Sequence, residues 1–157
     1  MNEQLNFMQQ AVELSSAGMH NREGGPFGCV IVKEGKVIGK GNNKVFLNND
    51  PTAHAEIVAI RDACAHLQTN TLDGCELYTS CEPCPMCLSA IYWARIKKIY
   101  YANTSADAAR IGFDDEAIYR ELAKPKQERL LPAENLGREI AIKVFNEWHQ
   151  KEDKELY

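Results

Sequence analysis

The sequence predicts an α/β fold in which one mixed β-sheet has helices on both faces. Two apolar runs near the N-terminus, residues 29–32 and 36–38, flank a Glu-Gly pair and together indicate a β-hairpin. After the hairpin, strand patterns and helix patterns alternate along the chain as far as residue 103. Strands that alternate with helices after an opening hairpin form a mixed sheet that helices cover on both faces.

The first element is an amphipathic helix over residues 3–18. Five apolar residues recur at helical spacing and form its expected buried stripe: Leu5, Met8, Ala11, Val12 and Leu14. The stretch NREGGPFG then ends the helix, because its glycines and its proline favour a turn. The hairpin follows this turn directly.

A second helix is expected over residues 54–67, after a loop rich in Asn, Asp and Pro. Asp50 or Thr52 would cap its first turn, because a short side chain with an oxygen accepts hydrogen bonds from free backbone N–H groups. Four apolar residues at helical spacing form its expected buried stripe: Ile57, Ile60, Cys64 and Leu67.

The remaining elements follow in this order: strand 75–80, helix 84–94, strand 97–103, helix 114–123 and helix 138–152. The last helix is indicated by three apolar residues four positions apart: Ile140, Val144 and Trp148. The segment 124–137 shows no regular pattern. Because no repeat, low-complexity tract or linker interrupts the chain, we expect a single domain over residues 1–157.

Size, charge and composition narrow the class of protein. The chain has 157 residues and a net charge of −4, which argues against nucleic acid as the main partner, because phosphate binding needs a surplus of Lys and Arg. The first residues, MNEQLNFMQQ, lack the features of a secretory signal, and no apolar run approaches the ~20 residues of a membrane span. We therefore expect a cytoplasmic protein with reduced cysteines and no membrane partner.

Two short motifs predict a metal site. His54 and Glu56 belong to H-A-E, and Cys84 and Cys87 belong to P-C-x-x-C. His and Cys are borderline-soft ligands that favour zinc, and three protein ligands leave the fourth position for water, which marks a catalytic site. Two thiolates and a neutral imidazole also cancel the charge of Zn²⁺, so the pKa of a bound water falls toward ~7.

The spacing of these residues indicates that they lie at the starts of two helices. Cys84 and Cys87 stand at i and i+3 in a first turn, where the positive end of the helix dipole favours thiolates. His54 and Glu56 are two residues apart, and both lean over a helix end only if they lie in its first turn. We therefore expect the zinc between the N-termini of the second and third helices.

Cys81 leaves two interpretations open. As a fourth ligand it would close a structural Cys₃His site, whereas at the end of its strand it would only pack nearby. We prefer the second interpretation, because a closed site would leave no place for water and no task for Glu56. Three other cysteines fall in strand or helix patterns and are expected in the core: Cys29, Cys64 and Cys75.

The two motifs together are those of zinc-dependent nucleobase deaminases. The chain resembles the cytidine deaminase-like superfamily and, within it, the small bacterial guanine deaminases over nearly its whole length. Five stretches carry the resemblance: GGPFGCVIV, NDPTAHAEIVAIR, YTSCEPCPMCLSAIYWAR, DAARIGFDDEAIY and the terminal KELY. The first three stretches recur across related deaminases. GFDD and an aromatic last residue occur in fewer of them and favour guanine as the substrate. The sequence departs from the family pattern between about residues 124 and 146.

The resemblance implies a three-layer αβα sandwich with a mixed five-stranded sheet. It also implies one zinc per subunit, held by His54, Cys84 and Cys87, with Glu56 as the proton shuttle. Finally, it implies a homodimer in which the C-terminal segment, residues 138–157, swaps to the partner and covers the partner's active site.

Six substrate contacts are also implied by the resemblance: Phe27, Asn43, Ala55, Trp93, Asp115 and Tyr157. An amide such as Asn43 both donates and accepts hydrogen bonds, and a carboxylate such as Asp115 suits the N–H groups of guanine. Aromatic side chains offer a flat surface for stacking, and Tyr157 of the partner subunit would close the pocket. Without a role in substrate binding, the aromatic residues would pack in the core. FDD would then be the start of a helix with acidic residues in its first turn.

The expected reaction is the hydrolysis of guanine to xanthine and ammonia. Cytosine, cytidine or another small aminated heterocycle is the nearest alternative substrate, because the zinc motif serves all of them. A tRNA adenosine deaminase is the second alternative, but it would need a basic surface for phosphates. A catalytically silent, zinc-stabilised binding domain is the third, and the intact Glu56 argues against it.

Overall fold

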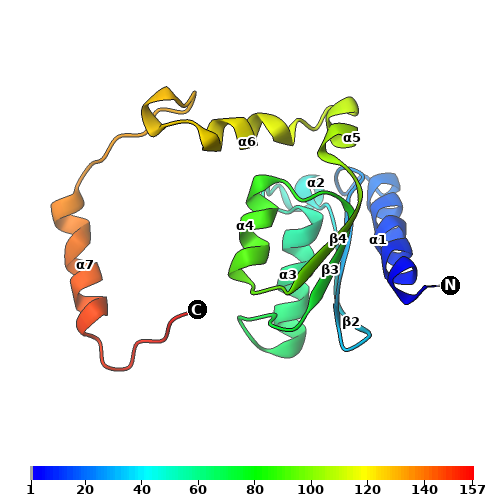
Figure 1. The fold of residues 1–157 in the computed structure, drawn as a ribbon, viewed down its shortest axis with the longest axis horizontal. Helices are drawn as coiled ribbons and strands as arrows, with labels where there is room; N and C mark the ends of the chain where they lie inside the picture. The colour runs from blue at the N-terminus through cyan, green and yellow to red at the C-terminus, as the bar shows by residue number, and fades with distance from the viewer. Residues whose placement is uncertain (1) are drawn as a thin grey trace. The chain divides into compact units, whose positions relative to one another are not determined.

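The computed structural model describes residues 2–157 (Figure 1). Its helices are α1 Glu3–His20, α2 Val45–Asn48, α3 Ala55–Leu67, α4 Pro85–Trp93, α5 Ser105–Arg110, α6 Asp115–Ala123 and α7 Arg138–Gln150, with a 3-10 turn, η1, at Lys126–Glu128. Its strands are β1 Gly28–Lys33, β2 Lys36–Asn42, β3 Glu76–Cys81 and β4 Lys98–Asn103. Residues up to Ile118 form one compact unit and Tyr119–Tyr157 form a second. Within residues 2–157, no helix is both long enough and apolar enough to cross a membrane.

The strands form one mixed sheet in the order β2-β1-β3-β4. β1 pairs antiparallel with β2 and with β3, and β3 pairs parallel with β4. The predicted hairpin closes at Glu34 and Gly35, whose φ angles of 49° and 73° are those that a two-residue turn between twisted strands requires. The predicted mixed sheet and its hairpin are therefore confirmed.

The sheet of residues 2–157 has four strands, so the expectation of five is wrong. That expectation came from the family resemblance, whereas the strand patterns in the sequence also number four. After β4, Thr104 starts α5 with a capping box in which its side chain and that of Asp107 each accept from the other's backbone N–H. In the later segment without a sequence pattern, Pro125 and Pro132 oppose strand pairing, because proline lacks a backbone donor.

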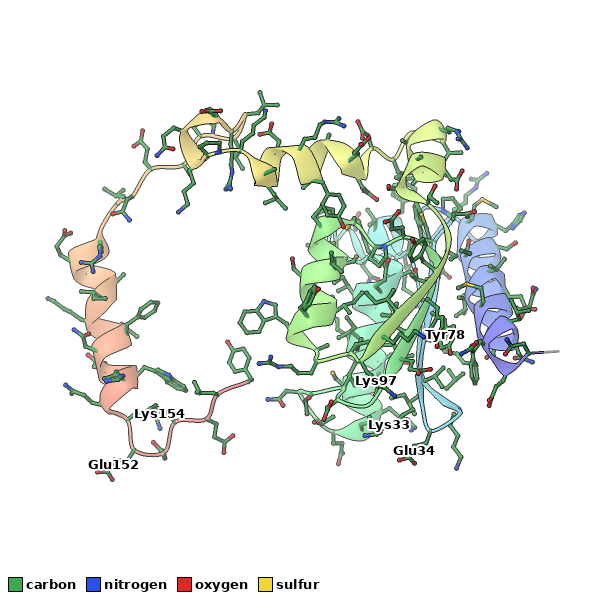
Figure 2. All side chains as sticks on the ribbon, viewed as in Figure 1. Lys33, Glu34, Tyr78, Lys97, Glu152 and Lys154 are labelled. Carbon is green, nitrogen blue, oxygen red and sulfur yellow. The ribbon has the colours of Figure 1, made fainter. Side chains whose placement is uncertain are left out.

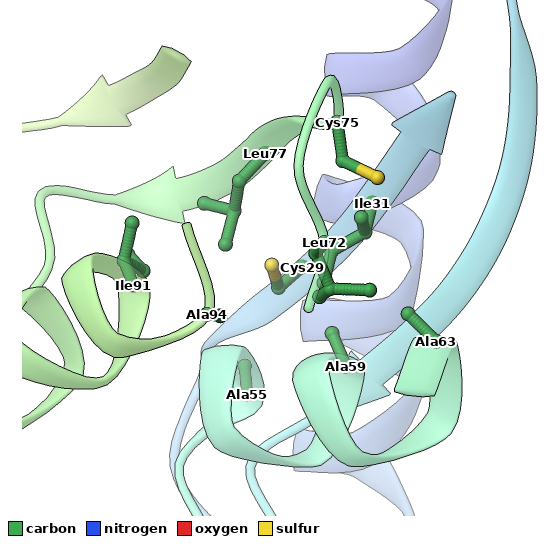
Figure 3. Close-up of a cluster of buried hydrophobic side chains, with 10 residues drawn as sticks. All are labelled: Cys29, Ile31, Ala55, Ala59, Ala63, Leu72, Cys75, Leu77, Ile91 and Ala94. Atoms are coloured by element: carbon green, nitrogen blue, oxygen red, sulfur yellow. The ribbon is translucent and has the colours of Figure 1, made fainter. Parts of the chain in front are cut away.

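Helices cover both faces of the sheet in the first unit, as predicted. α1 lies on one face, on the side of Tyr78 (Figure 2). Phe7 of this helix packs on Tyr78, with ring centroids 5.3 Å apart. On the other face α3 and α4 enclose a second cluster (Figure 3). Its fully buried members from the sheet and α3 are Cys29, Ile31, Leu77, Ala55, Ala59 and Ala63. Cys29 and Cys75 are fully buried and Cys64 packs against this cluster, which confirms their predicted core placement.

The buried side of α1 differs in part from the expected stripe. Ala11 is fully buried as predicted, but Leu5 and Val12 are 60% and 41% exposed. Phe7, which was not in the expected stripe, faces the sheet instead. Apolar residues occur on more than one side of this helix, so the position of the Tyr78 ring, and not the spacing alone, decides which side is buried.

The buried side of α3 is formed by three alanines and one carboxyl residue. Four are buried: Ala55, Glu56, Ala59 and Ala63. The expected residues Ile60, Cys64 and Leu67 pack only partly against the cluster. The reason is the close approach of α3 to β2 at Gly41, where a Cβ would collide with the Ala55 carbonyl oxygen and lie 2.6 Å from the Ala59 nitrogen.

The second unit contains the predicted C-terminal helix as α7. Four large apolar side chains of this helix are exposed: Ile140, Val144, Phe145 and Trp148. The other predicted late helix is α6, which begins at Asp115.

We predict that Gly41→Ala destabilises the protein by about 2 kcal/mol or more, because the added methyl group meets helix backbone that has no room to yield. The melting temperature is expected to fall by several degrees. Lys40→Ala on the same strand is the control, since the Lys40 side chain is exposed. Equal melting temperatures for the two variants would contradict the close packing of α3 on β2.

Candidate metal centre and active site

Two helices of the first unit begin with a residue that can bind a metal. His54 is the N-cap of α3, with φ −68° and ψ 157°, and Cys84 is the N-cap of α4, with φ −66° and ψ 168°. Neither side chain makes a capping hydrogen bond to its own helix, so both are available to a ligand. Asp50 and Thr52, the expected caps of α3, instead hydrogen-bond to each other in the preceding loop, so that expectation is wrong.

Three potential ligand atoms converge at these helix starts. The Sγ atoms of Cys84 and Cys87 each lie 3.5 Å from Nδ1 of His54. One ligand atom from each of the three residues lies within 4.8 Å of the others. The expected meeting of the two helix N-termini is therefore present in the structure.

Protonation states within this cluster are coupled. Hydrogen bonds from Cys87 and then from His54 lower the pKa of the Cys84 thiol to about 4. The same contact with Cys84 raises the pKa of Cys87, so this thiol keeps its proton, and it also raises the pKa of His54. Metal binding requires the thiolate forms and would displace the thiol protons.

The chemistry of these donors fits zinc. One imidazole nitrogen and two sulfurs form the mixed soft donor set that zinc prefers, and three protein ligands are typical of a catalytic zinc site. With both sulfurs ionised, the ligand charge of −2 balances the dication. Burial of Cys84 and Cys87 strengthens the attraction, because a low local dielectric screens it less.

Cys81 lies outside this cluster. Among residues 2–157, only His54, Cys84 and Cys87 form a group with metal-binding spacing. The Cys81 Sγ lies 3.6 Å from the carbonyl oxygen of Thr104 instead, and burial raises its pKa to about 11. The structure therefore favours the interpretation in which Cys81 packs beside the site without binding the metal.

Glu56 is a buried carboxyl group next to the cluster. It is the second residue of α3, only 6% exposed, and its Oε1 accepts a hydrogen bond from the Thr79 hydroxyl at 3.3 Å. Burial is the main cause that raises its pKa. A carboxyl group that burial makes easier to protonate can both take up and release a proton, as general acid–base catalysis requires.

The cluster opens into a pocket of about 210 Å³ in the first unit. Phe27, Asn43 and Asp115, three of the predicted substrate contacts, line it together with Glu56. The Asn43 Oδ1 accepts from the Val45 N–H at 3.1 Å, so the amide nitrogen remains as a donor. The pocket thus offers a donor at Asn43 and an acceptor at Asp115.

The other three predicted contacts lie elsewhere. Ala55 is fully buried in the first turn of α3, and Trp93, the last residue of α4, is 63% exposed. Neither lines the pocket. Tyr157 belongs to the second unit. Their contacts with substrate stay predictions.

Several pocket residues were not among the predicted contacts. Phe113 packs edge-to-face on Phe27, with ring centroids 4.9 Å apart, and Glu82 accepts from the Ser105 N–H at 2.9 Å. Phe113 stands in the GFDD stretch, so the sequence contained a signal for it. Glu82 lies inside the C-E-P-C stretch, where the neighbouring cysteines dominate the interpretation.

The FDD segment starts α6 and also reaches the pocket. Oδ1 of Asp114 accepts from the Ala117 N–H at 3.2 Å and so caps α6, whereas the next residue, Asp115, lines the pocket. Burial, followed by the nearby Cys84 charge, raises the pKa of Asp115.

Comparison with known proteins identifies the class that this fold and site define. Residues 1–103 match the cytidine and deoxycytidylate deaminase zinc-binding region, and the chain belongs to this family. It is 50% identical over 151 residues to the guanine deaminase of Bacillus subtilis (strain 168), a match that covers 96% of this chain and 97% of that protein. The resemblance predicted from the five sequence stretches is therefore confirmed.

Solved structures agree with this assignment. The X-ray structure of guanine deaminase from Bacillus subtilis superimposes with a TM-score of 0.93 at 50% identity, covering 97% of both chains. A structure from a study of A-to-I editing by tRNA deaminases at the wobble position is 35% identical, with a TM-score of 0.66 over 83% of this chain and 95% of that chain. The cytidine deaminase-like fold is thus confirmed, and so is the predicted class of enzyme.

We predict that Cys84→Ala loses most of the bound zinc, whereas Cys81→Ala retains the zinc content of the parent protein. The reason is that Cys84 contributes one of three converging ligand atoms and Cys81 contributes none. Metal content is measured by inductively coupled plasma mass spectrometry after gel filtration. Loss of zinc from Cys81→Ala to the same extent would contradict the three-ligand arrangement.

Proposed function

We propose that this protein hydrolyses guanine to xanthine and ammonia. The observation that carries the proposal is one pocket that holds a buried carboxyl group, a His/Cys/Cys cluster, an amide donor and a second carboxylate. The likeness to guanine deaminase along nearly the whole chain supports this substrate. A pocket of about 210 Å³ is also consistent with a small heterocycle.

The proposed metal is one zinc ion per chain, held by His54, Cys84 and Cys87. When bound, zinc supplies a Lewis acid that makes water a nucleophile near neutral pH. The chain contributes the fixed donors and a partly enclosed setting in which charges interact strongly.

Glu56 is the proposed proton shuttle. Its carboxylate accepts a proton from the attacking water, which adds to C2 of guanine. The carboxylic acid then protonates the ring nitrogen. The carboxylate takes the second proton from the hydroxyl now on C2 and passes it to the amino group, so that the C2–N bond breaks, ammonia leaves and the C2 carbonyl of xanthine forms. Burial supports this role, because it raises the pKa of Glu56 and so favours the protonated form that the second half of the reaction uses.

Recognition of guanine follows from its hydrogen-bonding edges. Guanine has an acceptor at O6 and N–H donors at N1 and at the amino group on C2. We assign the Asn43 amide nitrogen to the acceptor and the Asp115 carboxylate to the donors. Phe27, and by the same logic Phe113, presents an aromatic surface to the ring.

The proposal extends to the C-terminal segment. We propose a homodimer in which residues 138–157 reach the partner subunit and Tyr157 of the partner subunit closes the pocket. The exposed apolar side of α7, which includes Ile140 and Trp148, supports the idea that this helix packs on another surface. A cytoplasmic location and the absence of a nucleic-acid partner stay predictions.

The test of the proposed function is a substrate panel with the zinc-loaded protein. Guanine, cytosine, cytidine and a tRNA anticodon stem-loop are incubated separately, and ammonia release is measured, with ultraviolet detection of xanthine for guanine. We expect turnover of guanine to exceed that of every other substrate. Turnover of the tRNA alone, with a steep dependence on salt, would replace the proposal with tRNA deamination.

We predict that Glu56→Gln keeps its zinc but loses guanine turnover by about 100-fold or more, because an amide cannot shuttle protons. The control is Glu76→Gln, since Glu76 lies on β3 and does not line the pocket. Steady-state kinetics and metal analysis are measured for both variants. Near-normal turnover by Glu56→Gln would show that Glu56 is not the proton shuttle.

We predict that deletion of residues 155–157 leaves zinc in place and reduces guanine turnover by about 10-fold or more. Tyr157 would be lost from the partner's pocket, and water would enter more freely. Glu155→Ala is the matched control, because it changes the same segment without removing the aromatic residue. Undiminished turnover after the deletion would refute a catalytic lid.

A further inference from the structure

The side chains of β3 alternate between the two faces of the sheet. Leu77 belongs to the cluster under α3 and α4, whereas Tyr78 belongs to the cluster under α1. Because successive residues of a strand point to opposite faces, Thr79 lies on the α3 side with Leu77, and Ser80 lies on the α1 side with Tyr78. Thr79 is therefore a polar residue on a face whose buried neighbours are apolar.

The Thr79 side chain is almost completely buried, with 1% exposure. Its hydroxyl donates to Oε1 of Glu56 at 3.3 Å, and this is the only hydrogen bond that the structure shows for it within residues 2–157. Valine has nearly the same shape and is at least as favourable in a buried strand. Packing alone therefore does not explain a hydroxyl group at this position.

We propose that Thr79 is a positioning residue for Glu56. By holding Oε1, the hydroxyl fixes the rotation of the carboxyl group and leaves Oε2 as the oxygen that exchanges protons. Glu56 has three rotatable side-chain bonds, and its position in the first turn of α3 restricts only the first part of the side chain. A fixed donor on the central strand supplies a restraint in addition to the hydrogen bond between the Glu56 carboxyl group and Cys87.

The expected effect on kcat rests on the proposed function, whereas the expected effect on the orientation of the Glu56 carboxyl group does not. A misplaced shuttle oxygen slows the chemical step, because proton transfer needs donor and acceptor within hydrogen-bond reach. We expect binding of substrate by Asn43 and Asp115 to be unaffected, because the Thr79 hydroxyl donates to Glu56, whereas the Asn43 side chain is held by the Val45 N–H. The proposal therefore predicts that loss of the Thr79 hydroxyl lowers kcat and leaves KM unchanged.

The experiment compares Thr79→Val with Thr79→Ser. We expect Thr79→Val to keep its zinc, its melting temperature and its KM for guanine within about twofold, and to lose about 10- to 100-fold in kcat. Thr79→Ser keeps the hydroxyl and is expected to retain kcat within about threefold. Parental kcat in Thr79→Val, or equal losses in both variants, would overturn the proposal.

The matched control removes a hydroxyl from the other face of the same strand. Ser80 is also buried, and its Oγ accepts from the Gly28 N–H at 3.0 Å. Ser80→Ala is expected to lower the melting temperature while leaving kcat unchanged, because this bond does not reach Glu56. A loss of kcat equal to that of Thr79→Val would show that any buried hydroxyl on β3 has the same effect, and would overturn the proposal.

A crystallographic readout keeps this inference independent of the substrate. In the structure of Thr79→Val we expect the Glu56 carboxyl group to rotate or to occupy more than one orientation, and in Thr79→Ser to keep one. If guanine is not turned over, the proposed function fails, and the position of Glu56 still decides the role of Thr79. An unmoved, singly oriented Glu56 in Thr79→Val overturns that role.

Discussion

The site depends on the meeting of two helix starts. α3 and α4 begin with His54 and Cys84, and each residue takes the extended conformation of an N-cap without capping its own helix. Both side chains are thus available to one ion, and Cys87 completes the set from the first turn of α4. Packing of the two helices on one face of the sheet brings these helix starts together.

Small residues make this packing close enough to bury a carboxyl group. Gly41 lets the backbone of α3 lie directly on β2, and Ala55 and Ala59 fill the contact on either side of Glu56. Burial disfavours the ionised form of Glu56, so folding stability falls as pH rises from the ordinary pKa of a glutamate to its raised pKa in the folded protein. A proton shuttle needs this buried environment. A cation held by the neighbouring ligands would offset the cost of ionising the buried carboxyl group.

The pocket combines residues that fit chemistry common to deaminases with residues that lie on or next to the connection between α5 and α6. His54 and Glu56 belong to a helix packed in the core, which fits chemistry that many deaminases share. Phe113 lies between α5 and α6, and Asp115 is the first residue of α6. The edge-to-face contact of Phe113 with Phe27 joins this connection to the strand side of the pocket. Changes in such a connection alter the substrate without altering the metal site, so one fold can serve several bases.

The hairpin, the main helices and the cluster of His54, Cys84 and Cys87 could be predicted from the sequence, because turn chemistry, periodicity and i, i+3 spacing are local properties. Tertiary structure alone decided which sides of α1 and α3 are buried, since that choice depends on the Tyr78 ring and on the space at Gly41. It also decided that Cys81 lies beside the ligand cluster and that Phe113 reaches the pocket. These outcomes depend on distances between elements far apart in the chain, which spacing along one element does not contain.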